Sequence, residues 1–140
     1  MNVEGYGWSV VEVKGGPRFA GVAALQPVPF VAAFTPAQEI AWRFAPKAWG
    51  HGYATEAAKA LLGVAFEKLG WPEVVAMTAA TNTRSRRVME RLAMTHDPQD
   101  DFDHPRLPHG HPLARHVLYR AHSGLLAVQR QDADDDFEQN

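Results

Sequence analysis

The sequence contains no cysteine. Disulfide bonds, thiolate metal sites and a cysteine nucleophile are therefore excluded for these 140 residues. No stretch approaches the roughly 18 consecutive apolar residues of a transmembrane helix, and Met1 to Glu4 do not begin a signal peptide. Internal repeats and low-complexity linkers are also missing. Together these absences favour a cytoplasmic protein.

The chain has little net charge, but its charged residues are distributed unevenly. The formal net charge is −2, yet residues 132–140 hold five acidic residues and no basic one. Removing those five from the 16 acidic residues leaves 11, against 14 basic residues. This small positive excess is too weak to indicate nucleic acid, but it suits an anionic small ligand. We expect one domain over residues 1–122 and an acidic, disordered tail over 123–140.

The composition is that of a globular protein, with 46% hydrophobic and 21% charged residues. Alternating and β-branched residues predict strands in the first third, and a three- and four-residue apolar spacing then predicts a helix that stops at Gly70. The expected strands cover residues 8–14, 19–26 with a continuation over 30–34, 39–44, 74–78 and 116–120, and the expected helices cover 55–69 and 82–92. A polar loop is expected over 97–115. This order predicts an α/β (α+β) fold, a mixed, mostly antiparallel twisted sheet with helices packed on it.

The turn before the first helix carries the most informative chemistry. Gly50 and Gly52 leave backbone N–H groups open to a ligand, and the following helix adds the positive end of its dipole. Such a turn can bind a phosphate or pyrophosphate. The alternative is a tight turn in which Thr55 caps the helix. The spacing matches neither a P-loop nor a dinucleotide-binding fingerprint.

Several segments around this turn resemble one known family. Residues 39–57 resemble the acetyl-CoA motif of the GNAT N-acetyltransferases, and residues 82–94 resemble the asparagine–serine helix of the branch that acetylates ribosomal-protein N-termini (RimJ/RimL-like). Residues 101–105 and 116–120 are also similar to that branch. The likeness extends from about residue 8 to residue 120. The family normally begins with a strand and two helices that have no counterpart here, so the resemblance implies an N-terminally shortened GNAT-like fold.

The resemblance implies an N-acetyltransferase that moves the acetyl group of acetyl-CoA to a primary amine, either a protein N-terminus or a small molecule. Without cysteine, direct transfer in a ternary complex is expected. The shortened N-terminus leaves an uncovered sheet edge or face, which favours a homodimer. One alternative is a catalytically weak or inactive acyl-CoA-binding module. Another is a metal- or partner-binding protein built around the histidines.

Residue by residue, the resemblance implies a cofactor site with one departure, Lys47, which stands where the motif has glutamine or arginine. Asn82 would bind the pantetheine arm, or else it simply caps a helix. Ser85 would protonate the leaving thiolate, or else it is an exposed helix serine. The implied cofactor-binding residues are Trp49, Gly50, His51, Gly52, Tyr53, Ala54, Thr55, Asn82 and Ser85.

The remaining candidates concern proton transfer and the acceptor. Glu39 is the first candidate for the general base, with an exposed strand-edge glutamate as the alternative. Tyr119 is a second acid candidate, with a core tyrosine as the alternative. A backbone N–H of the strand over 74–78 is expected to stabilise the oxyanion. Trp8 and Trp42 are interpreted as packing residues.

The histidine-rich loop does not match a zinc signature, because His109 and His111 lie in a proline-rich segment with unsuitable spacing. No metal is therefore expected. In the branch resembled, such a loop flanks the acceptor cleft. We accordingly interpret Asp103, His104 and His116 as acceptor-binding residues or bases.

Overall fold

The computed structural model describes residues 7–15 and 19–124. The acidic tail expected over 123–140 lies almost wholly outside these residues. The strands are β1 (Gly7–Val11), β2 (Gly21–Pro27), β3 (Gln38–Phe44), β4 (Glu73–Ala79), β5 (Thr95–His96), β6 (Phe102–Asp103) and β7 (Arg115–His122). The helices are α1 (Tyr53–Gly63), which continues as the π-helical η2 (Val64–Lys68), and α2 (Thr83–Arg91), with short 3₁₀ turns η1 (Pro46–Ala48) and η3 (Pro98–Asp100).

The strands form one mixed sheet in the order β1-β2-β3-β4-β7-β5, with β6 also pairing with β7. The pairs β1–β2, β2–β3 and β4–β7 are antiparallel, whereas β3 and β4 run parallel. The expected mixed, mostly antiparallel sheet is therefore confirmed. The carboxyl end of β3 leads through η1 into α1, and the carboxyl end of β4 leads through a short turn into α2.

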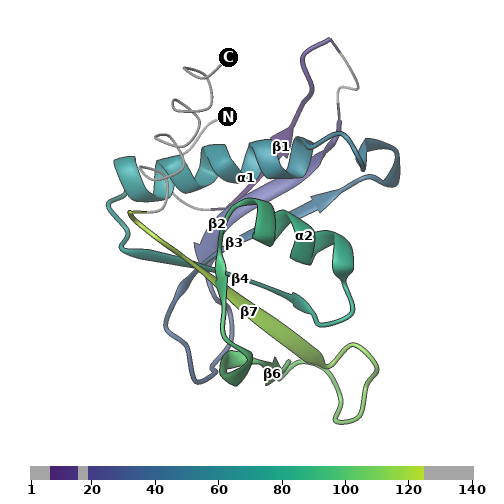
Figure 1. The fold of residues 1–140 in the computed structure, drawn as a ribbon, viewed down its shortest axis with the longest axis vertical. Coiled ribbons are helices and arrows are strands. Elements are labelled where there is room, and N and C mark those ends of the chain that lie inside the picture. Colours follow the sequence, from purple (N-terminus) through teal and green to yellow (C-terminus); the bar gives the residue numbers. More distant parts are fainter. Residues whose placement is uncertain (1–6, 16–18, 125–140) are drawn as a thin grey trace, which may run out of the picture.

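Both helices lie on the same face of the sheet and cover it (Figure 1). Alternation along the strands supplies the apolar side chains of this face, because successive residues point to opposite faces. Ile40 of β3, Ala76 of β4 and Val117 of β7 thus meet Leu62 of α1 and Met89 of α2 in one core. The intervening residues, among them Glu39, lie on the opposite face.

Two details differ from the sequence-based expectation. Residues 30–34 do not continue the second strand but lie in the loop between β2 and β3, because the chain turns at Pro27 and Pro29 instead of extending. The expected loop over 97–115 contains β6, and β5 lies just before it. No helix among residues 7–15 and 19–124 is long and apolar enough to cross a membrane.

Candidate functional site

A gap opens in the sheet between its two parallel strands. The register of β3 with β4 holds one pair, Glu39 opposite Val75. By contrast, β2 and β3 pair along their whole length, from Gly21 opposite Phe44 to Pro27 opposite Gln38. Beyond Glu39 the two parallel strands therefore diverge toward their carboxyl ends. The carboxyl ends of parallel strands are where ligands bind in open sheets. Two adjoining cavities lie at this end of β3 and β4.

The first cavity, of about 270 Å³, lies at the start of α1. Gly52 is the residue before the helix and has φ +78°, in the left-handed region that glycine adopts most readily. The first helical hydrogen bond runs from the Glu56 N–H to the Gly52 carbonyl. The N–H groups of Tyr53, Ala54 and Thr55 consequently have no acceptor within the helix. A helix start of this kind favours a bound anion.

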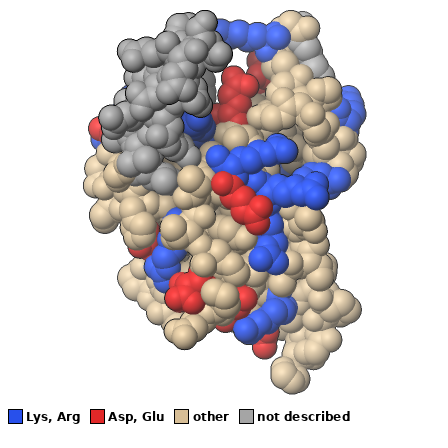
Figure 2. Space-filling model, viewed as in Figure 1, with Lys and Arg blue, Asp and Glu red and all other residues tan. Residues whose placement is uncertain are grey.

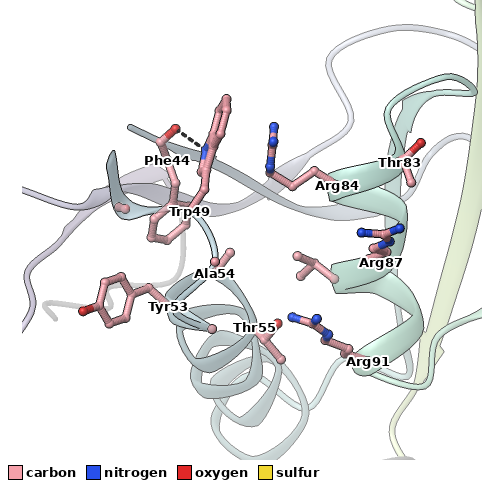
Figure 3. A pocket seen from close by; sticks show the side chains of 13 residues that line it. Phe44, Trp49, Tyr53, Ala54, Thr55, Thr83, Arg84, Arg87 and Arg91 are labelled. Atoms are coloured by element: carbon pink, nitrogen blue, oxygen red, sulfur yellow. Dashed lines mark hydrogen bonds between the residues drawn. The ribbon is translucent and has the colours of Figure 1, made fainter. Parts of the chain in front are cut away.

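Three arginines of α2 line the wall opposite this helix start. Arg84, Arg87 and Arg91 are spaced three and four residues apart, so they follow one face of α2 over about 10 Å. Figure 3 shows Arg84 extending toward Trp49 and Arg91 extending toward Thr55. In the space-filling view, basic side chains gather around α2 on the same face of the molecule (Figure 2).

Thr55 contributes an unusual polar atom to the same cavity. Its Oγ1 is buried and has no hydrogen-bond partner among the residues that the structure describes. A buried hydroxyl normally has a partner. A phosphate oxygen between the start of α1 and the arginines would supply one. The donor set thus fits an anion with several oxygens better than a neutral ligand.

Trp49 and Arg84 contact each other across the cavity. The Cζ atom of Arg84 lies 3.4 Å from the centre of the Trp49 ring, in cation–π geometry. The indole Nε1–H of Trp49 donates a hydrogen bond to the Phe44 carbonyl at 3.0 Å. The stack of Arg84 on Trp49 connects the turn before α1 with the first turn of α2.

The second cavity, of about 340 Å³, occupies the gap between the diverging strands. Its walls combine polar and apolar groups, and the apolar ones include Ile40 and Trp42 from β3, Met77 from β4 and Met89 from α2. Thr78, Asn82 and Ser85 add polar atoms at the β4–α2 junction. The two cavities adjoin, so a ligand with an anionic head and a long, weakly polar arm would fit both.

The family model for the acetyltransferase (GNAT) domain matches residues 1–95. This chain belongs to the GNAT family. Its GNAT domain is 38% identical over 99 residues to the FsC-acetyl coenzyme A-N(2)-transacetylase of Aspergillus fumigatus, covering 68% of this chain and 41% of that protein.

Solved structures of acetyltransferases have folds similar to this one. A GNAT-family acetyltransferase from Bacillus anthracis is 28% identical with a TM-score of 0.66, covering 83% of this chain and 66% of that one. The ribosomal-protein-S5-alanine acetyltransferase from Vibrio fischeri has a TM-score of 0.67 at 15% identity, covering 83% and 61%, which shows the fold alone. This GNAT chain therefore spans less than two thirds of the length of these relatives.

The structure brings the residues expected to bind the cofactor to these two cavities, with one exception. Trp49, Gly50, Gly52, Tyr53, Ala54 and Thr55 line the first cavity. His51 stacks on Tyr53 with ring centres 5.1 Å apart and does not line either cavity. The alternative in which Thr55 caps the helix is wrong, because Gly52 precedes the helix and Thr55 lies in its first turn.

Asn82 and Ser85 lie together at the start of α2. The Asn82 Oδ1 accepts a hydrogen bond from the Ser85 backbone N–H at 3.2 Å, so Asn82 does cap the helix. Both residues also line the second cavity, and Ser85 is half-buried rather than exposed. The cap does not exclude pantetheine binding, which stays a prediction, as does the acid role of Ser85.

Glu39 is buried, with 8% of its surface exposed, so the exposed strand-edge alternative is wrong. It lies where β3 and β4 begin to diverge and accepts a hydrogen bond from Gln26 Nε2 at 2.7 Å. Burial raises the pKa of Glu39 above its usual value, and the Gln26 hydrogen bond opposes that rise only in part. A carboxyl group with a raised pKa is a better proton acceptor near neutral pH.

Tyr119 is a core residue, 3% exposed, and it does not line either cavity. Its hydroxyl accepts a hydrogen bond from Arg86 Nε at 3.3 Å, and its ring stacks on His96. The surroundings of Tyr119 are therefore those of a core tyrosine, the alternative given for it above.

The residues expected at the acceptor side form a separate group on the sheet face opposite the helices. The rings of His104 and His116 lie 4.9 Å apart beside Phe102, and Asp103 pairs with Arg115 at 3.5 Å. Burial lowers the pKa of His104, and the nearby His116 and Arg106 lower it further. Within the described residues, no group of three or more metal-binding side chains comes together.

The sequence-based reasoning did not identify the three arginines. Their three- and four-residue spacing is visible in the sequence, but Arg86 stands between them as an equally basic residue. The structure separates these side chains, because Arg86 turns away to the Tyr119 hydroxyl and the Ala80 carbonyl. Only the position of α1 shows which face of α2 meets the helix start.

Proposed function

We propose that this protein is an acetyl-CoA-dependent N-acetyltransferase. One observation carries the proposal: a cationic cavity at a helix start adjoins a cavity of mixed polarity between two diverging strands. The diphosphate of coenzyme A suits the first cavity, and its pantetheine arm suits the second. The name of the fungal relative, an acetyl coenzyme A-N(2)-transacetylase, agrees with a nitrogen acceptor.

The chain's own residues would divide the work as follows. The N–H groups at the start of α1 and the arginines of α2 hold phosphate oxygens, and Asn82 orients the arm. When bound, acetyl-CoA supplies an activated acetyl thioester for direct transfer in a ternary complex. Glu39 accepts the amine proton, directly or through water, and Ser85 donates a proton to the leaving thiolate. A backbone N–H of β4 stabilises the developing oxyanion.

Calorimetric titration with acetyl-CoA tests the cofactor site. We expect saturable binding near one site per chain, and a loss of at least ten-fold in affinity when Arg87 and Arg91 are both replaced by alanine, since each charged hydrogen bond contributes about 1.5–3 kcal/mol. Lys59→Ala is the control, because Lys59 is exposed on α1 and does not line either cavity. A folded wild-type protein that does not bind acetyl-CoA would contradict the proposal.

The second candidate function is an acyl-CoA-binding module without turnover, because the candidate base Glu39 does not line either cavity. Release of free thiol from acetyl-CoA in the presence of amines separates the two candidates. A bound but unreactive cofactor would favour the module. Peptide N-termini and small amines are the acceptors to screen, because we propose that the chain belongs to the RimJ/RimL-like branch. We also propose that the acetyltransferase domain covers residues 1–122.

We also propose a homodimer that covers the edge strand β1. Trp8 and Val10 are 51% and 57% exposed on this strand, which has one neighbour, β2, in the described sheet. Exposed apolar residues on an open edge favour association. Light scattering should give twice the chain mass at micromolar concentration, and Trp8→Lys should shift the protein toward the monomer. A wild-type monomer would contradict this part of the proposal.

A further inference from the structure

Gln26 and Glu39 stand directly opposite each other in the sheet. They form one pair of the antiparallel register of β2 with β3, which continues without a break on both sides of them. The side chains of such a pair share one face of the sheet and lie close together. The amide Nε2–H of Gln26 donates a hydrogen bond to Glu39 Oε1 at 2.7 Å. Because the sheet fixes both backbones, this one bond decides how the carboxyl group is turned.

The two oxygens of the Glu39 carboxyl group have different surroundings. Oε1 accepts the bond from Gln26, whereas Oε2 accepts none from the residues that the structure describes. In this part of the chain, the buried side-chain polar atoms without a partner are Gln38 Oε1 and Thr55 Oγ1, and Glu39 Oε2 is not one of them. An oxygen that has no partner and is not buried keeps contact with solvent. Water can therefore reach Oε2, although only 8% of the residue is exposed.

The position of Glu39 in the fold makes this solvent contact relevant to proton transfer. Glu39 is the residue of β3 that pairs with β4, and the two strands diverge after it. The next two residues, Ile40 and Ala41, line the second cavity, whereas Glu39 lines neither cavity. A proton from an acceptor in the gap therefore reaches the carboxyl group through water, and Oε2 is the oxygen with that access.

We propose that Gln26 is a positioning residue, which holds Glu39 Oε1 and so makes Oε2 the oxygen that receives the proton of the acceptor amine. The inference rests on the proposed function and adds a residue that the sequence-based reasoning did not identify. When the acceptor nitrogen gives up its proton, the N–H bond breaks and its electron pair stays on nitrogen. The proton passes to a bridging water, which gives one of its own protons to Oε2.

Gln26 suits both protonation states of its partner, because its amide carries donor N–H groups and an acceptor oxygen. Ionised Glu39 accepts a bond from Nε2–H. After a rotation of the amide, the O–H of neutral Glu39 donates to the amide oxygen. The bond to the charged form is the stronger of the two, so Gln26 favours ionised Glu39. It thereby opposes the burial that raises the pKa of Glu39.

Other charges around Glu39 do not decide its titration. Neither β1 nor the loop between β2 and β3 holds a charged residue. None of the charged or titratable side chains on this sheet face and on the loop over it moves the pKa of Glu39, which responds to burial and to the Gln26 bond. These side chains are Arg43, Glu73, Asp100, His104, His116, Arg120 and His122. A shift of the Glu39 limb in a pH profile therefore reports on Gln26.

Gln26→Met tests the positioning role, because methionine has a similar length and lacks the amide. We expect lower turnover and an acidic limb of the kcat profile shifted to higher pH by roughly one to two units, the equivalent of one hydrogen bond to a charged group. Above the shifted limb, kcat should recover only in part, because Oε1 has lost its anchor. Calorimetric affinity for acetyl-CoA should stay unchanged. A carbon-13 NMR titration of the Glu39 carboxyl group measures the same shift without turnover.

Two further variants separate positioning from a general effect of the substitution. Gln38→Met is the matched control, since Gln38 precedes Glu39 in β3 and forms no hydrogen bond with it. Its limb should stay at the wild-type pH. Gln26→Glu keeps the shape of the side chain but places two carboxyl groups opposite each other, and these would share a proton. Its limb should shift at least as far as that of Gln26→Met.

The outcomes distinguish the role of Gln26 from the function on which it rests. An unshifted limb and an unshifted carboxyl titration in Gln26→Met, in a protein whose Glu39→Gln variant loses turnover, would overturn the role of Gln26 alone. Equal shifts in Gln26→Met and Gln38→Met would do the same. A protein that binds acetyl-CoA without turnover, or a Glu39→Gln variant with wild-type turnover, would overturn the proposed base, and the role of Gln26 with it.

Discussion

Replacing Gly52 with valine is expected to abolish acetyl-CoA binding and leave a folded protein. Gly52 has φ +78°, and its carbonyl accepts the first hydrogen bond of α1 from Glu56. A β-branched residue in the left-handed region costs at least about 1–2 kcal/mol, so the turn should leave this conformation. The N–H groups at the start of α1 would then no longer point together into the first cavity. Calorimetric titration of the variant measures the loss.

Gly70→Val is the matched control for this prediction. Gly70 also has a left-handed φ, +67°, with open space around the position of a Cβ atom, and it follows the other end of the same helical segment. We expect both variants to lose a similar amount of unfolding free energy, while Gly70→Val keeps its affinity for acetyl-CoA. Equal affinity in Gly52→Val and the wild type would contradict the phosphate site at this turn.

Replacing Glu39 with glutamine is expected to lower turnover by roughly 10²–10⁴-fold, the usual contribution of a general base. The same change should raise the stability of the protein at neutral pH. Ionised Glu39 is buried beside a single hydrogen-bond donor, Gln26, and burial disfavours the charged form. Glutamine keeps the shape and removes the charge. Activity and stability should therefore change in opposite directions.

The pH dependence gives the sign of the Glu39 effect. Because its pKa is raised in the folded state, the contribution of Glu39 to stability is fully present below its usual pKa of 4.5 and is lost as pH rises through the folded value. The stabilisation by Glu39→Gln should accordingly disappear below about pH 4.5. Turnover of the wild type should rise with pH through the same raised pKa, and this limb should be absent in the variant.

Glu73→Gln is the control for the Glu39 variant. Glu73 lies on the same sheet face but is paired with Arg120 at 2.7 Å. Removing its charge should lower stability, because the half-buried Arg120 loses one of its two carboxylate partners and keeps Asp100 at 3.3 Å. Turnover should stay unchanged. Thermal unfolding across pH and steady-state turnover measure both variants. A Glu39→Gln protein with wild-type turnover would show that Glu39 is not the base.

The expectations from sequence held where the cause is local. Periodicity and stop signals placed the first long helix before Gly70, and the alternation in residues 39–44 placed a strand, because both signals depend on neighbouring residues. They were wrong for residues 30–34, which have strand-like composition but no partner strand in the structure. The short strands β5 and β6 escaped notice, since their pairing with β7 is a long-range contact.

The features of the candidate site also fall into local ones and ones formed by segments distant in sequence. The glycine turn and the Asn82–Ser85 helix start are local motifs, and the sequence by itself determined them together with the family resemblance. Three features depend on how β3, β4, α1 and α2 pack together: the gap beyond Glu39, the burial of that carboxyl group, and the row of Arg84, Arg87 and Arg91 opposite the start of α1. Only the tertiary structure decided these features, because segments distant in sequence form each of them.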